Sequence, residues 1–213
     1  CQKKCPFGAI SIVNLSIQLD SPIHLYGKNL FRLHRLPLPK EGKVVGLIGR
    51  NGLGKTTALN ILSGKIVPNF GNLDEKPSWE KAIQYFRGKE AQGFFEKISL
   101  GKIFVSVKPQ QVDLLPKAVK GNKNVAQLLH DADETNSFDF VVEQLSLQPV
   151  LENSLQNISG GELQKVAIAA AAMKQAGLFF FDEPTSYLDI RQRINVAKFI
   201  GSIAAKGKSV LVV

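Results

Sequence analysis

Cysteine and long hydrophobic runs are scarce in this chain of 213 residues. The two cysteines, Cys1 and Cys5, are too few to hold a [4Fe–4S] cluster by themselves. No apolar stretch approaches the ~20 residues that a membrane-spanning helix needs, and neither a secretory signal nor an internal repeat is found. We therefore expect an intracellular protein with one α/β core, or one core with an insertion.

Acidic residues are also in deficit, and this leaves a formal net charge of +9. Such an excess favours a polyanionic partner, although charge alone does not identify it. The helical segment around residues 79–100 also has an excess of basic side chains. Basic side chains outnumber acidic ones there, which fits contacts with phosphate groups and fits an ordinary solvated surface almost as well.

One glycine-rich segment fits the phosphate-binding pattern G-x-x-x-x-G-K-[ST] at residues 49–56. Residues 43–48 before it predict a buried parallel strand, and residues 56–62 after it predict a helix that stops at Gly64. In this setting backbone N–H groups converge on phosphates, Lys55 reaches the β- and γ-phosphates, and Thr56 binds Mg²⁺. The alternative is a structural glycine-rich turn. The expected nucleotide contacts are Gly49, Asn51, Gly52, Gly54, Lys55, Thr56 and Thr57.

A second segment, residues 159–164, reads Ser-Gly-Gly-Glu-Leu-Gln. Ser159 is expected to cap a helix whose first turn carries Gly160, Gly161 and Glu162, with its N-terminus open to an anion. The apolar residues that follow predict one buried stripe: Leu163, Val166, Ala167 and Ala170.

Two carboxylates follow an apolar run at residues 178–181, which predicts a buried strand. Asp182 at the strand end suits Mg²⁺, because an isolated buried carboxylate is costly. Glu183 is then placed to orient or deprotonate a water molecule. The alternative is a pair of surface acids.

Gln110 follows a strand expected at residues 102–107, so its amide is a candidate contact for both Mg²⁺ and that water, or an ordinary solvated glutamine. Tyr26 and Phe31 offer flat faces for adenine, or belong to the core. Asp189 is expected to open a helix through Ile190, Ile194 and Ala197.

Residue spacing predicts the remaining elements. We expect a β-rich N-terminal piece that includes the alternating residues 9–19, and two short helices around 79–86 and 94–98. Further helices are expected at 124–130 and 138–147, and a last strand at 209–213.

These motifs together resemble the ATP-binding cassette (ABC) superfamily, in which residues 186–189 match the D-loop. Within it, the chain resembles the E subfamily of ribosome-recycling ATPases, also called RNase L inhibitors. The segments that carry this resemblance span nearly the whole chain: 5–15, 26–27 with 35–37, 86–90, 108–110, 116–121 and 182–189.

The resemblance implies a fold: an ABC-type P-loop nucleotide-binding domain with an N-terminal β-subdomain, a helical signature subdomain and a helix-loop-helix insertion. It implies that residues 1–10 are the end of a ferredoxin-like iron–sulfur domain, with Cys1 and Cys5 as cluster ligands in the full-length protein. Residues 11–213 would be the nucleotide-binding domain, with the insertion at about 79–100, cut before a switch histidine.

The resemblance also implies a function: ATP hydrolysis that splits post-termination ribosomes, in translation termination and initiation, with this fragment weak or inactive alone. Each ATP would lie between residues 49–56 of one domain and residues 159–164 of another. The implied partners are a second nucleotide-binding domain of the same polypeptide, the small ribosomal subunit with its rRNA, and a release factor, without a membrane. The implied location is the cytoplasm, with the nucleus as a second one.

Two departures from the family pattern are mild: Ile158 stands where leucine is usual, and Lys165 where arginine is usual. Two rival functions stay open. A membrane transporter's nucleotide-binding subunit would share every ATP residue, and a non-catalytic ribosome or RNA scaffold would bind ATP without needing Glu183.

Overall fold

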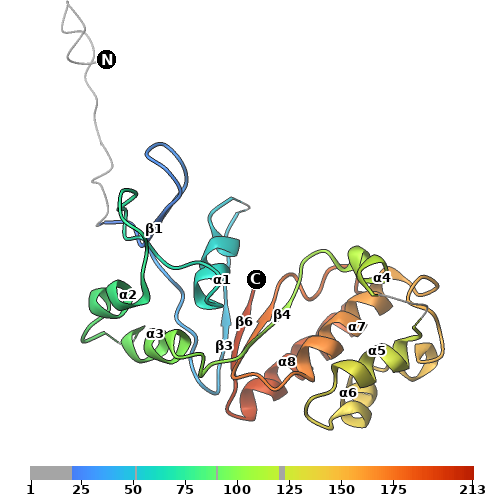
Figure 1. Ribbon diagram of the computed structural model, residues 1–213. Helices are drawn as coiled ribbons and strands as arrows, with labels where there is room; N and C mark the ends of the chain where they lie inside the picture. Colours follow the sequence, from blue (N-terminus) through green and yellow to red (C-terminus); the bar gives the residue numbers. More distant parts are fainter. Residues whose placement is uncertain (1–20, 51, 90, 120–122) are drawn as a thin grey trace, which may run out of the picture.

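The computed structural model describes residues 21–50, 52–89, 91–119 and 123–213 (Figure 1). Four of the predictions above lie outside these residues: the alternating segment 9–19, Cys1, Cys5 and Asn51. Within the described residues, no helix has both the length and the apolar character that crossing a membrane requires.

A parallel sheet of four strands forms the centre of the molecule, in the order β3, β6, β5, β4. The strands are β3 (Val44–Gly46), β6 (Ser209–Val212), β5 (Leu178–Phe181) and β4 (Val105–Lys108). Phe181 is paired with Lys108 on one side and with Val212 on the other. Because the strands are parallel, their carboxyl ends share one edge, where ligands bind in sheets of this kind.

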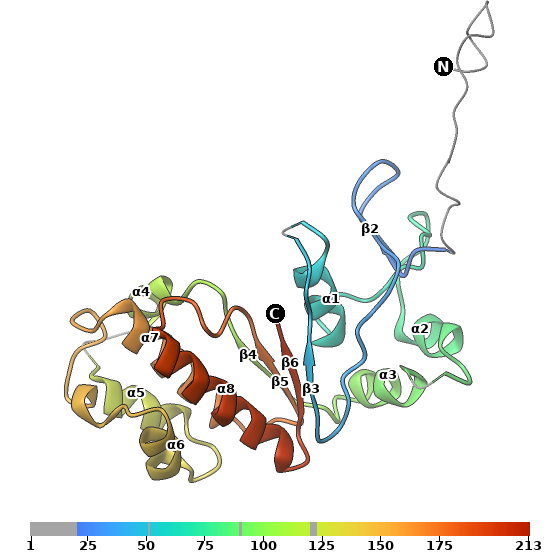
Figure 2. The same ribbon diagram turned by 180° about the vertical axis from the view of Figure 1, so that it is seen from behind.

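Helices cover both faces of this sheet, as Figures 1 and 2 show. Phe179 and Phe181 pack with α7 (Gly160–Ala172) and α8 (Ile190–Ala205). Leu178 and Phe180 point the other way and pack with α1 (Lys55–Leu62). This alternation follows from the two-residue period of a strand, and the predicted α/β class is confirmed.

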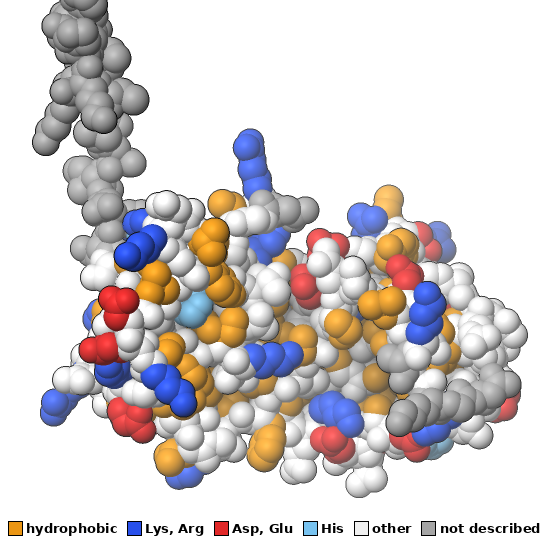
Figure 3. Space-filling view, turned by 45° about the horizontal axis from the view of Figure 1, so that its top comes forward, with side chains coloured by type: hydrophobic (Ala, Val, Ile, Leu, Met, Phe, Trp, Pro, Cys, Tyr) orange, Lys and Arg blue, Asp and Glu red, His pale blue; other side chains and the backbone are white. Residues whose placement is uncertain are grey.

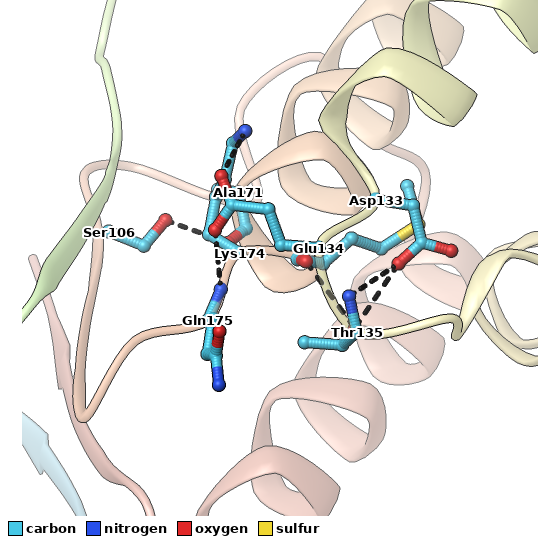
Figure 4. A network of polar contacts seen from close by, with 8 residues as sticks. Ser106, Asp133, Glu134, Thr135, Ala171, Lys174 and Gln175 are labelled. Carbon is cyan, nitrogen blue, oxygen red and sulfur yellow. Dashed lines mark hydrogen bonds and ion pairs between the residues drawn. The ribbon is translucent and has the colours of Figure 1, made fainter.

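Short helices surround α7 on the side away from α1. They are α5 (Val125–Ala132) and α6 (Phe138–Gln144), with η2 (Val112–Leu114), α4 (Leu115–Ala118) and η3 (Gln148–Val150). Figure 4 shows how the end of α7 is fastened. Ser106 Oγ of β4 donates to the Ala171 carbonyl at 2.7 Å, and Lys174 Nζ donates to Glu134 Oε1 at 2.8 Å. The helical subdomain is thus joined to the sheet by hydrogen bonds as well as by apolar packing.

The N-terminal part contains an antiparallel pair, β1 (His24–Leu25) and β2 (Arg32–Leu33), and two helices, α2 (Trp79–Tyr85) and α3 (Ala91–Ser99). Aromatic rings hold these helices against each other: Phe86 and Phe95 stack with centroids 4.9 Å apart. The prediction of two short helices here is confirmed. On the face drawn in Figure 3, basic and acidic side chains are interspersed and form no single basic patch.

One sequence-based prediction of burial was wrong. Residues 43–48 were expected as a buried strand, but β3 is an edge strand and Val44 is 43% exposed. The helix that Asp189 was expected to open is confirmed as α8, in which Ile190 is 77% exposed and Ile194 51%. The buried residues of α8 are Val196, Phe199, Ile200, Ile203 and Ala204.

The remaining differences concern extents. Buried residues surround most of α7 rather than forming one stripe, because α7 lies between the sheet and the helical subdomain. The strand expected at 102–107 runs from 105 to 108. The helix expected at 138–147 ends at Gln144, and Ser146 then has a left-handed backbone with φ of 50°.

Candidate functional site

The glycine-rich loop joins β3 to α1, as its sequence predicts. Gly54 is the N-cap of α1 with φ of 86°, and no side chain caps the helix. The first N–H groups of α1 therefore lack a side-chain acceptor, an arrangement that suits an anion. Lys55 Nζ donates to the Gly49 carbonyl at 2.8 Å, so the ammonium group lies against the loop.

A cavity of about 390 Å³ opens beside this loop. It collects predicted site residues from four separate parts of the chain. They are Tyr26, Phe31, Gly52, Gly54, Lys55, Thr56, Thr57, Gln110, Asp182 and Glu183. Gly49 instead lines a neighbouring cavity with Leu53 and Ile48. The sheet edge thus places the phosphate loop, the two acids and the glutamine around one space.

The two acids follow β5 directly. Gln110 Nε2 donates to Glu183 Oε1 at 3.0 Å, and Ser186 Oγ donates to Glu183 Oε2 at 3.3 Å. Burial raises the pKa of Asp182, and the Glu183 charge raises it further, while Lys108 and Lys55 oppose that change. Both oxygens of the Glu183 carboxylate are therefore oriented, and cations compensate part of the negative charge at the strand end.

Lys108 is a site residue that the sequence interpretation missed. Its side chain is fully buried, and Nζ donates to the Asp182 main-chain carbonyl at 2.7 Å. Burial lowers the pKa of Lys108 to about 8, against the opposite effect of the Asp182 and Glu183 charges. One signal was available: the lysine lies at the end of an apolar strand, two residues before Gln110, which was already singled out.

The two aromatic candidates differ in setting. Tyr26 is 47% exposed, and its hydroxyl lies 3.3 Å from Thr57 Oγ1. Phe31 is partly buried and packs against the core cluster of α1 and α3. A Cβ on Gly54 would lie 2.2 Å from Phe31 Cζ, so the ring needs the glycine. Tyr26 therefore has an exposed ring face for a ligand, while Phe31 packs against Gly54 of the loop in addition to lining the cavity.

The residues of the 159–164 segment do not line this cavity. Ser159 and Glu162 form a capping box, in which Ser159 Oγ and Ser159 N each donate to Glu162 Oε2 at 2.7 Å. These bonds from Ser159 lower the pKa of Glu162. Gly161 lies against the Tyr187 carbonyl, where a Cβ would approach to 2.9 Å. Asp189 caps α8. Together with Gly160, these residues make a second cluster outside the lining of the first cavity.

The cavity residues fit a magnesium nucleotide. Mg²⁺ prefers oxygen ligands and is often held by one or two carboxylates plus substrate phosphates, and Thr56, Gln110 and Asp182, which carry side-chain oxygens, all line the cavity. Among the described residues, no cluster of three His, Cys, Asp or Glu side chains could hold a metal without such phosphates. These residues therefore remain predicted nucleotide and metal ligands.

Comparison with known proteins identifies the family. The model of the family described as "ABC transporter" matches residues 39–186. The chain belongs to the ABC family. Solved ABC subunits that are only 19% and 22% identical share the fold, with TM-scores of 0.59 and 0.60.

Relatives within the ABC family are more similar. The chain is 48% identical to translation initiation factor rli1 of Schizosaccharomyces pombe, over 100% of this chain and 36% of that protein. Archaeal ABCE1 in a model of its ribosome-bound complex with Pelota is 55% identical, with a TM-score of 0.87 over 99% of this chain and 35% of that one. The chain thus spans about a third of the length of these relatives.

Another solved relative is archaeal ribosome recycling factor aABCE1 in complex with ribosomal stalk protein aP1. It is 53% identical, with a TM-score of 0.82, over 90% of this chain and 36% of that one. A molybdenum import ATP-binding protein of Paramagnetospirillum magneticum is 32% identical over 76% of this chain and 43% of that protein. The similarity to translation factors is therefore higher and covers more of the chain than this similarity to a transporter subunit.

Proposed function

We propose that this chain is the first nucleotide-binding domain of an ATPase that splits post-termination ribosomes into subunits. The observation that carries the proposal is the cavity where Lys55, Gln110 and Glu183 meet. The ribosomal role is supported by the relatives, which are called translation initiation factor and ribosome recycling factor.

In the proposed reaction, N–H groups of the loop and of α1 bind the phosphates of ATP, and Lys55 donates to the β- and γ-phosphates. Thr56, Asp182 and Gln110 would hold Mg²⁺, which would neutralise charge on the phosphates. Glu183 orients the attacking water and takes its proton. Its Oε1 bond to Gln110 fixes the carboxylate for that task. Tyr26 and Phe31 contact adenine.

The second cluster serves another nucleotide in this proposal. Ser159, Gly160, Gly161, Glu162 and Asp189 lie outside the cavity that holds Lys55. A second nucleotide-binding domain of the same polypeptide would therefore use them to cover its own ATP, while its equivalent segment covers the ATP bound here. Binding closes the pair and hydrolysis reopens it, which shifts the conformational populations. An isolated domain is then weak or inactive.

The proposal includes the domain layout. Residues 1–10 end an iron–sulfur domain, with Cys1 and Cys5 as [4Fe–4S] ligands in the full-length protein, and residues 11–213 form the nucleotide-binding domain. The insertion at about 79–100 contacts rRNA of the small subunit, and a release factor acts before splitting. The site of action is the cytoplasm, with the nucleus as a second location.

The experiment that tests this function is sedimentation of the full-length Glu183→Gln protein with ATP, in parallel with ribosomal and membrane fractions. We expect it to travel with the small ribosomal subunit, because ATP without hydrolysis holds the closed state. Migration with membranes instead would favour a transporter subunit. Wild-type ATP turnover in the variant, together with ribosome binding, would favour the non-catalytic scaffold.

A further inference from the structure

The backbone of Glu183 has a left-handed conformation, with φ of 45°. Residues other than glycine, asparagine and aspartate rarely adopt this conformation, because their Cβ atom crowds the following carbonyl. Such a conformation persists only where the surroundings fix it. The contacts that fix Glu183 are therefore of interest for its role in the proposed ATPase.

Three elements hold the peptide groups on either side of Glu183. From β4, Lys108 Nζ donates to the Asp182 carbonyl at 2.7 Å, which belongs to the peptide bond before Glu183. From α7, Gln164 Nε2 donates to the Glu183 carbonyl at 2.7 Å. Next to β6, Glu183 N donates to the Val213 carbonyl at 3.0 Å. Two of these three contacts come from polar side chains.

Both side chains are buried at a cost. Lys108 and Gln164 are each 0% exposed. Gln164 Oε1 has no hydrogen-bond partner among the described residues. Within these residues, the side-chain amide of Gln164 therefore bonds only through Nε2, to the Glu183 carbonyl. Burying an ammonium group or a half-satisfied amide disfavours folding. The stability of the fold therefore does not explain why Lys108 and Gln164 are buried here. The need to fix the backbone of Glu183 does explain it.

We infer that Lys108 and Gln164 are positioning residues that hold the backbone of Glu183 in the geometry its carboxylate needs. The inference rests on the ATPase function proposed above. Gln164 lies one turn into the helix that Ser159 caps. A movement of the start of α7 would therefore reach Glu183 through a single hydrogen bond, without passing through the nucleotide cavity.

The test compares three variants of the full-length protein in ATP hydrolysis and ATP binding. Gln164→Leu and Lys108→Met remove the two contacts. Ser106→Ala is the matched control, because Ser106 is also buried on β4 and its Oγ also donates to a carbonyl, that of Ala171. We expect kcat to fall about ten- to a hundredfold in the first two, as for a misplaced catalytic group. We expect the ATP affinity of both variants to stay within about twofold of wild type. For the Ser106→Ala control, we expect both kcat and ATP affinity to stay within about twofold of wild type.

Thermal unfolding separates positioning from a merely structural role. Gln164→Leu removes a buried unpaired oxygen, and the Glu183 carbonyl still accepts from Ser186 N at 3.3 Å. We therefore expect Tm to stay level or rise while kcat falls. Should Lys108→Met fail to fold, Gln164→Leu and the milder Lys108→Gln still decide the matter.

A double mutant completes the test. If Gln164 acts through Glu183, Gln164→Leu adds no further loss to Glu183→Gln in single-turnover hydrolysis. Losses that multiply, or a Gln164→Leu protein with wild-type kcat, would overturn the inference. If the wild type hydrolyses no ATP, the proposed function itself fails. If Glu183→Gln abolishes hydrolysis while Gln164→Leu does not lower it, only the positioning role fails.

Discussion

Gln110 and Glu183 are 73 residues apart in sequence, and the Gln110 amide donates to the Glu183 carboxylate at 3.0 Å. The two residues follow β4 and β5, which are neighbours in register. The pairing of these strands therefore sets the distance between a predicted metal and water ligand and the predicted base. A change in the loop after β4 is therefore expected to alter the position of the Glu183 carboxylate after β5.

Glu183→Gln tests the base. We expect ATP hydrolysis by the full-length protein to fall by roughly 10²- to 10⁴-fold, the usual effect of losing a general base. ATP binding should persist, because the phosphate loop is intact. Phosphate release and nucleotide titration measure the two quantities. Unchanged hydrolysis would remove Glu183 from the reaction.

Gly54→Ala tests the glycine of the loop. A methyl group there meets Phe31 Cζ at 2.2 Å, and the backbone φ is 86°. We expect ATP binding to be lost, together with a stability loss greater than the roughly 1–2 kcal/mol of a left-handed alanine. The matched control is Gly207→Ala, where φ is 81° but nothing lies within 4 Å. Equal stability losses would show that Phe31 moves away freely.

Tyr26→Ala tests adenine stacking. Loss of an aromatic face costs about 0.5–1.5 kcal/mol, which corresponds to roughly 2- to 13-fold weaker ATP binding. Tyr26→Phe keeps the ring and removes only the hydroxyl near Thr57 Oγ1, so it should bind ATP almost as the wild type does. Inorganic triphosphate lacks adenine and should bind all three proteins equally. If its affinity falls as well in Tyr26→Ala, the tyrosine supports the loop instead.

Lys108 predicts a pH dependence of stability. Its folded pKa of about 8 lies below the ordinary value of 10.5, so the unfolded chain binds more protons between these values. Stability then rises with pH across this window. We compare the free energy of unfolding of the wild type with that of Lys108→Met. Between pH 8 and pH 10.5, we expect this difference to change by about 3 kcal/mol in favour of the wild type. Parallel denaturation curves at several pH values measure it, and a constant difference would contradict it.

The phosphate loop and the acidic pair were predictable because each depends on a short stretch of sequence. A strand, glycines and a helix in order specify the loop, and four apolar residues before Asp182 specify a buried strand. Their meeting in one cavity was expected through the family resemblance rather than from periodicity.

Long-range pairing explains what could not be predicted. The exposure of Val44 depends on β3 lying at the sheet edge, and that order involves residues more than 160 positions away. On α8, apolar residues occur on both faces, so periodicity could not choose between Ile194 and Val196. Lys108 was missed because a lysine is almost never fully buried unless it is paired, and its acceptor, the Asp182 carbonyl, follows another strand.

The order of the sheet has a consequence for biosynthesis. Translation proceeds from the N-terminus, yet β6, which lies between β3 and β5, is made after both. On the nascent chain, the strand that leads to the phosphate loop and the strand that leads to the acids have no common neighbour until Val212 has left the ribosome. We therefore expect these two parts of the site to come together only after β6 has been made.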